Sequence, residues 1–146
     1  MKKFQFRLER VLQYRKLLKD EKTKELILSR NKLFGEMEHL KELEMAALLN
    51  TIEDNIQITA EEIHLLGAYG ERLKEDIEHQ KEEIERSQEA VAKAEDAYIE
   101  AAKDEETLAT LKEKRKAEYA DYLNKEELKA IDEMTTQRSA YNKLNF

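Results

Sequence analysis

The 146-residue sequence lacks cysteine, proline and tryptophan, and it contains only three glycines. Average usage would supply roughly seven prolines and ten glycines in a chain of this length. Without cysteine the chain forms no disulfide or thiolate metal site and has no cysteine nucleophile, so a reducing cytosol is the expected compartment. Without proline, its helices can be long, because every residue supplies a backbone N–H.

Long apolar runs are also scarce. The longest is Met45–Leu49, whereas a membrane-spanning helix needs about 20 apolar residues. The charged, apolar and small-residue regions of a secretory signal peptide are not found either. We therefore expect a cytoplasmic protein that does not cross a membrane.

What the sequence does contain is charge and helix-forming residues. Charged residues make up 40% of the chain, and Ala, Glu, Lys, Leu and Arg together account for 86 of its 146 residues. About half or more in these five types, with helical periodicity, is typical of long helices and coiled coils.

A helix start is predicted by the segment around Thr59. The Thr59 hydroxyl can accept a hydrogen bond from the backbone of Glu62, whose carboxylate can reach back to Thr59, forming a capping box. Asn55 lies just upstream and suits a helix end. We therefore expect a single helical hairpin over residues 1–146, with helix one at about 4–54, a turn at about 55–59 and helix two at about 60–140.

Heptad spacing indicates how these two helices pack. Apolar or small residues recur every seven positions after the turn, and a second series follows three residues behind the first. The two series are Ile63, Gly70, Ile77, Ile84, Val91, Tyr98 and Leu66, Leu73, Gln80, Ser87, Ala94, Ala101. Helix one carries Leu26, Leu33, Leu40 and Ala47 at the same spacing, preceded by Phe4, Leu8, Val11 and Leu18. The predicted fold is all-α, an antiparallel two-helix coiled-coil hairpin with a longer second helix.

Two details of the hairpin follow from this pattern. Gly67 and Gly70 are expected to thin helix two where helix one approaches it closely. A turn near residue 57 brings Phe4 opposite about Leu111. The last part of helix two then extends past its partner and has little of the chain to pack against, so it is the segment most in need of a binding partner.

Charge is distributed unevenly along the chain. Residues 1–32 carry 11 basic and 4 acidic side chains, residues 33–102 carry 6 and 19, and residues 103–146 carry 9 and 10. In a hairpin both termini lie at one end, so that end is positive and the turn end is strongly negative. Such a field either reflects a solvated surface or steers different partners to the two ends.

Candidate chemistry is weak by comparison. Each histidine follows a carboxylate by three residues, in the pairs Glu36/His39, Glu61/His64 and Asp76/His79. This spacing occurs in di-iron four-helix bundles, but here the histidines fall beside the predicted seam instead of inside it. No glycine-rich phosphate loop is present. We expect no metal, no cofactor and no catalytic residues, and therefore no enzyme.

The basic N-terminal stretch leaves two further alternatives open. Its lysines and arginines, interleaved with Phe4, Phe6 and Leu8, could lie on an anionic membrane surface. Contact with nucleic-acid phosphates is disfavoured by the overall charge of −7 and by the lack of a groove-reading motif. We therefore expect no nucleic-acid partner and allow peripheral membrane contact.

Three segments resemble the FliJ family of the bacterial flagellar export apparatus. The opening Phe4-Gln5-Phe6-Arg7-Leu8-Glu9-Arg10-Val11-Leu12-Gln13-Tyr14-Arg15 is similar to the usual start of that family. The stretch from Lys103-Asp104-Glu105 through Leu108, Leu111, Lys112, Arg115 and Tyr119 is similar to its C-terminal half, as is Ala130-Ile131-Asp132-Glu133-Met134 with Arg138. The resemblance covers essentially the whole chain.

The resemblance implies a non-enzymatic stalk that binds the hexameric export ATPase and promotes its assembly and activity. It also implies contacts with the membrane protein of the export gate and with export chaperones, at the cytoplasmic side of the membrane at the flagellar base. The end carrying both termini would enter the ATPase ring, through Phe4, Leu8, Val11, Tyr119, Tyr122, Ile131 and Met134. Tyr69 and Leu73 lie where the family presents a gate-facing patch, although Asp76 and Gln80 depart from its usual residues. The alternative is a generic or prefoldin-like coiled-coil scaffold or chaperone.

Overall fold

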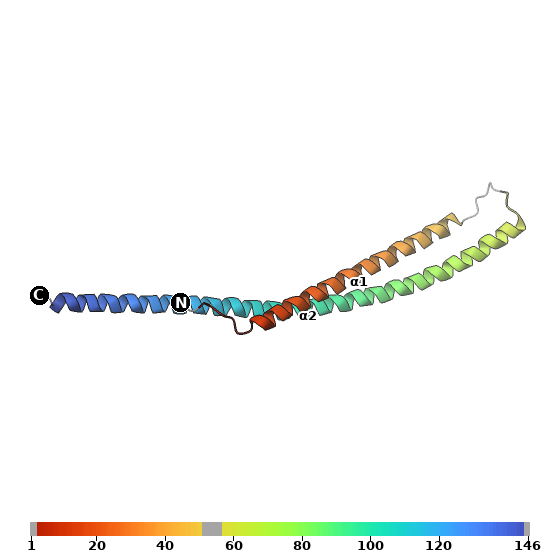
Figure 1. The fold of residues 1–146 in the computed structure, drawn as a ribbon. Coiled ribbons are helices and arrows are strands. Elements are labelled where there is room, and N and C mark those ends of the chain that lie inside the picture. Colours follow the sequence, from red (N-terminus) through yellow and green to blue (C-terminus); the bar gives the residue numbers. More distant parts are fainter. Residues whose placement is uncertain (1–2, 51–56, 145–146) are drawn as a thin grey trace. The chain divides into compact units, whose positions relative to one another are not determined.

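The computed structural model describes residues 3–50 and 57–144, which form two helices. Helix α1 spans Glu9–Leu49 and helix α2 spans Ala60–Leu144, so the second has 85 residues against 41 in the first (Figure 1). No strand occurs in the part of the chain that is described. The prediction of an all-α fold with two packed helices, the second longer, is confirmed.

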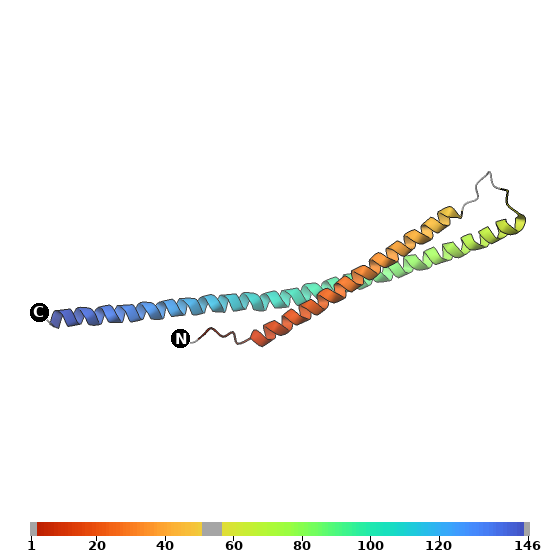
Figure 2. The ribbon, with the colours of Figure 1, turned by 45° about the horizontal axis from the view of Figure 1, so that its top comes forward.

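Contacts divide the chain into two units. The terminal unit, residues 3–17 and 102–144, pairs the start of α1 with the second half of α2. The central unit, residues 18–50 and 57–101, pairs the rest of α1 with the first half of α2. Figure 2 shows the same two helices from a second direction.

In both units the two helices run antiparallel. In the terminal unit Glu9 is paired with Lys112 and Arg15 with Asp104. In the central unit Arg30 is paired with Glu95, and just past the end of α1 the Asn50 side chain donates to the Leu66 carbonyl oxygen. The partner number on α2 falls as the number on α1 rises, which is the pairing of a helical hairpin.

The local signals at the turn act as predicted. The Glu62 backbone N–H donates to Thr59 Oγ1 at 3.3 Å, and the Thr59 N–H donates to Glu62 Oε2 at 3.4 Å. Helix α2 begins at the next residue, Ala60. Of the expected turn at 55–59, residues 57–59 are non-helical, whereas Asn55 and residue 56 lie outside the described residues.

The core is a thin seam between the helices. Its buried apolar residues are Leu12, Leu26, Leu73, Ile84 and Ala101, with Gln80 and Ser87 as buried polar members. All of these on α2 belong to the predicted heptad series. Gln80 is held by donating its Nε2 to the Glu36 carbonyl oxygen at 2.8 Å and to the Glu36 carboxylate. A buried amide is tolerated here because its donors are used.

The N-terminal part of the prediction needs correction. Helix α1 begins at Glu9 instead of about residue 4, and residues 3–8, which we call the strap, are not helical. The Phe4 ring lies 5.7 Å from the ring of Tyr119, farther along α2 than the expected Leu111. The reason is geometric, since a non-helical chain spans up to about 3.3 Å per residue against 1.5 Å in a helix. Leu12, 1% exposed, takes the seam position predicted for Val11, which is 41% exposed.

The two glycines of α2 differ from each other. A Cβ on Gly70 would lie 3.1 Å from Asn50 Nδ2, so the helices do approach closely there, as predicted. A Cβ on Gly67 would meet nothing within 4 Å, so the same prediction is wrong for that residue.

Candidate partner-binding surfaces

The strap and α2 together form an apolar groove in the terminal unit. Its volume is about 750 Å³, and its walls come from the strap residues and from one face of α2. The lining residues are Lys3, Phe4, Gln5, Phe6, Arg7, Leu8, Leu111, Arg115, Glu118 and Tyr119. The tilted ring pair of Phe4 and Tyr119 holds the strap against α2, because aromatic pairs in such geometry add to the burial of apolar area.

Ion pairs hold the start of α1 beside α2. Glu9 Oε2 lies 2.9 Å from Lys112 Nζ and is shielded from water. The hydrogen bond from Lys112 is the main cause that lowers the pKa of the Glu9 carboxyl, against the opposing effect of burial. One turn and a half farther along α1, Arg15 Nη1 lies 3.2 Å from Asp104 Oδ2. The side chains of both pairs remain about one-third exposed or more, so each pair adds little to the stability of the terminal unit.

The surface around the groove is positively charged. Lys3, Arg7 and Arg10 form no ion pair with a carboxylate in residues 3–50 and 57–144. Arg115, across the groove, forms an ion pair with Glu118 of the same helix, and its Nη1 lies 3.2 Å from Glu118 Oε2. An apolar floor with a cationic rim suits a partner that combines apolar and acidic side chains.

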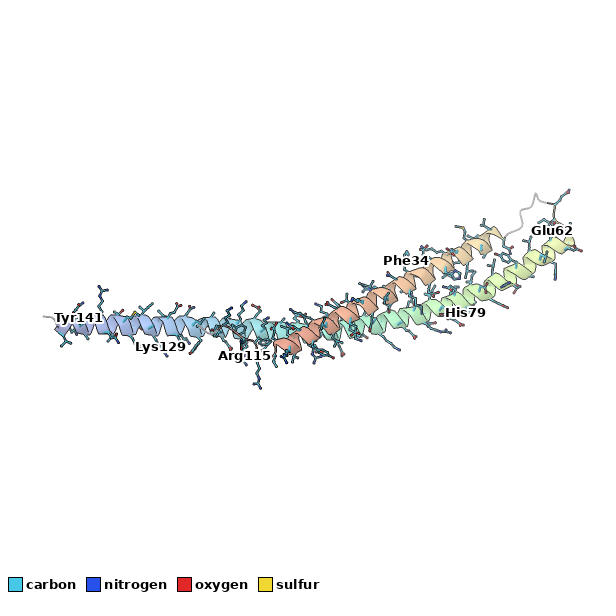
Figure 3. All side chains as sticks on the ribbon, viewed as in Figure 1. Phe34, Glu62, His79, Arg115, Lys129 and Tyr141 are labelled. Carbon is cyan, nitrogen blue, oxygen red and sulfur yellow. The ribbon has the colours of Figure 1, made fainter. Side chains whose placement is uncertain are left out.

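Beyond the strap, α2 continues with one face uncovered. Every residue from 124 to 144 is exposed, although all belong to the helix. Several large apolar side chains are among them, including Ile131 at 57%, Met134 at 69% and Tyr141 at 65% exposure. Lys129 and Tyr141 are labelled on this part of α2 in Figure 3.

Six apolar and two polar residues near this end of α2 fall in heptad register. Positions 120, 127, 134 and 141 form one series, and positions 123, 130, 137 and 144 form the second, three residues later. The members, which we call the free seam, are Ala120, Leu123, Glu127, Ala130, Met134, Gln137, Tyr141 and Leu144. At 100° per residue these side chains share one face of α2. A bare seam of this kind is a surface for another helix.

Comparison with known families decides to which family the chain belongs. The family model FliJ, described as flagellar FliJ protein, matches residues 4–144. The chain belongs to the FliJ family. It is therefore a non-catalytic component of the flagellar export apparatus, which stands at the base of the flagellum on the cytoplasmic side. No curated protein and no solved structure matches this FliJ-family chain significantly.

The seven residues predicted to meet the ATPase all lie in the terminal unit of this FliJ-family protein. Phe4 and Leu8 line the groove together with Tyr119 and are partly covered. The remaining four, Val11, Tyr122, Ile131 and Met134, are exposed, at 41%, 58%, 57% and 69% respectively.

The two residues predicted to face the export gate lie in the central unit and differ in access. Tyr69 is 49% exposed, whereas Leu73 is buried in the seam at 4% exposure. A direct contact at this patch would therefore have to come from Tyr69, with Leu73 holding the helix beneath it.

The three histidines lie on the central unit of the FliJ-family chain. His39 and His79 line a shallow groove with Asp76 and Glu83 in the central unit. Within residues 3–50 and 57–144, however, no three histidine, aspartate or glutamate side chains converge on a point where an ion could sit. Over the same residues, neither helix has a stretch long and apolar enough to span a bilayer.

Sequence reasoning missed two parts of the terminal unit. Arg7 and Arg115 line the groove because the strap is not helical, and no pattern in the sequence predicted that strap. Leu123 and Ala130 were missed as members of the free seam, although their spacing of seven residues could have found them.

Proposed function

We propose that this FliJ-family chain is the stalk subunit that binds the hexameric export ATPase through its terminal unit and promotes ring assembly and ATP turnover. The observation that carries the proposal is the free seam, because an uncovered helix with apolar residues in heptad register is stable only when something packs on it. The groove and its cationic rim add a second contact next to the seam, on the same unit.

The residues of the terminal unit have different roles in the proposed contact with the ATPase. Tyr122, Ile131 and Met134 are exposed and available to insert into a partner, whereas Phe4 and Tyr119 hold each other and shape the groove. Leu8, at the end of the strap, and Val11, on the first turn of α1, would be covered together. The apolar anchors would supply affinity, and the unpaired cations Arg7 and Arg10 would steer an acidic surface to them.

The central unit is left for the other partners. It carries most of the acidic residues of the chain, because residues 18–50 and 57–101 hold 20 of the 33 acidic side chains against 11 basic ones. We propose that Tyr69 is the residue through which this unit contacts the export gate, and that export chaperones bind the same unit. Contact with the membrane is then peripheral, through the cationic strap or through the gate.

The test adds the purified chain to purified export ATPase and measures hexamer formation and ATP turnover. We expect both to rise, and we expect Met134→Asp to reduce the stimulation at least about tenfold, since a buried unpaired charge costs more than the roughly 1.4 kcal/mol that this factor represents. Ser139→Asp is the matched control, because it adds the same charge to the same helix outside the free seam and should leave stimulation unchanged.

Absence of stimulation by the unaltered chain at micromolar concentration would reject the stalk role. If the chain instead prevents aggregation of exported subunits without affecting the ATPase, the scaffold or chaperone alternative holds. For the gate, Tyr69→Ala should weaken binding to the gate protein, whereas Leu65→Ala, also on α2 and 67% exposed, should not.

A further inference from the structure

The free seam has the features of half a coiled coil. Its residues lie on one face of α2, and every residue of α2 after Leu123 is exposed. Isolated helices of about this length are marginal in water, because tertiary packing supplies most of the stability of a helix. The segment therefore calls for an apolar helical partner of similar length.

The free seam also continues a face of α2 that is already used within the chain. Tyr119 packs against Phe4 of the strap, and Leu123, one turn later, is still partly covered. The next members in register, at 127, 130 and 134, have nothing over them. The strap and α1 cover this face of α2 up to about Leu123. After Leu123 the same face is open to another helix.

The free seam is complementary to itself in the antiparallel direction. When two copies are aligned so that Ala130 of one faces Met134 of the other, the remaining members pair as well. The layers then join Leu123 with Tyr141, Ala120 with Leu144, and Glu127 with Gln137. In two of these four layers a small residue, Ala130 or Ala120, faces a large one, which fills the space between the helices.

The polar layer decides the direction. In a parallel pair Glu127 would face Glu127 of the second copy, and two like charges inside a seam repel. In the antiparallel pair Glu127 faces Gln137, whose amide can donate to the carboxylate. The same combination is already used inside this chain, where buried Gln80 donates to the carboxylate of Glu36 across the antiparallel seam of the central unit.

We infer that two copies of this chain associate antiparallel through the free seam. Ile131, beside the seam, meets Ile131 of the second copy, which adds apolar contact near the two-fold axis. On the other side of the seam, Glu133 of one copy faces Glu133 of the second copy. The repulsion between these like charges weakens the pairing, so the dimer is reversible. The dimer does not rest on the proposed function, although both use Met134.

The first experiment measures mass in solution by light scattering over a range of protein concentrations, with no ATPase present. We expect the mass to rise from 17.3 kDa towards twice that value. Met134→Asp should keep it at the lower value, whereas Ser139→Asp should behave like the unaltered chain. Circular dichroism on each variant checks that α2 remains helical. A mass that stays at 17.3 kDa at the highest concentration would overturn the inference.

The second experiment reads the direction of pairing. Because the chain has no cysteine, Leu123→Cys and Tyr141→Cys each introduce a unique thiol. The two variants are mixed, oxidised and weighed by intact mass spectrometry, which separates the three disulfide-linked products. The antiparallel pair predicts mainly the mixed product, as the two thiols share a layer. A predominance of the two homodimeric products would indicate a parallel or non-specific association and would reject the proposed pairing. Neither experiment contains ATPase, so their failure is distinct from failure of the stalk role.

Discussion

Leu12 offers the sharpest test of where the core of this protein lies. It is 1% exposed and is the one described residue whose large side chain is fully buried, although it belongs to a helix with solvent on most sides. Leu17 lies in the same helix and the same unit but is 68% exposed. Replacing each leucine by alanine removes identical atoms, so the difference between the two variants reports burial alone.

The expected magnitudes follow from these exposures. Removing a buried leucine side chain costs about 2–5 kcal/mol of unfolding free energy, depending on how far the surroundings close the cavity. A two-helix seam has solvent on both sides and can relax, so Leu12→Ala should fall near the lower end, at about 2–3 kcal/mol. Leu17→Ala should change stability by no more than about 0.5 kcal/mol, since the site is exposed and alanine favours the helix slightly.

The assay is urea unfolding followed by the helical circular dichroism signal. With a denaturant slope of about 2 kcal/mol/M, the midpoint of Leu12→Ala should drop by about 1 M, whereas that of Leu17→Ala should stay within about 0.3 M of the parent. Equal midpoints for the two variants would refute the placement of Leu12 in the seam. If Val11→Ala lowered the unfolding free energy more than Leu12→Ala does, the seam position predicted from the sequence, Val11, would be correct instead.

Two further predictions concern the helix contacts. Gly67→Ala should raise the unfolding free energy by about 0.5–1 kcal/mol, because the added Cβ enters open space. Gly70→Ala should raise it less, because its Cβ would lie 3.1 Å from the Asn50 amide nitrogen. Thermal unfolding of both variants measures the difference. The lowered pKa of Glu9 means that its pairing with Lys112 stabilises the fold above pH 4.5, the ordinary value of the carboxyl, and that this contribution is lost as the pH falls through the lower folded pKa. The stability difference between the parent and Glu9→Gln should therefore shrink below pH 4.5, and a difference that grows there would contradict the ion pair.

Much of the fold could be predicted because its causes are local. The capping box needs only Thr59 and Glu62 at their spacing of three, and it starts α2 where the sequence places it. The heptad series of α2 predicts its buried face from Leu73 to Ala101. For the proposed ATPase contact, the resemblance and the charge distribution pointed to the residues of the terminal unit, and that assignment stays a prediction. The groove could not be predicted, because the strap is shaped by a long-range contact between Phe4 and Tyr119.

Sequence patterns alone therefore predicted two long helices, the start of α2 and its apolar face, because each of these depends on neighbours within about one heptad. Only the tertiary structure decided which residues of the two helices meet. It placed Tyr119 instead of Leu111 against Phe4, chose Leu12 over Val11 for the seam, and left the free seam uncovered. The physical reason is that register depends on the combined length of strap, helices and turn, and residues far apart in the chain set that length together.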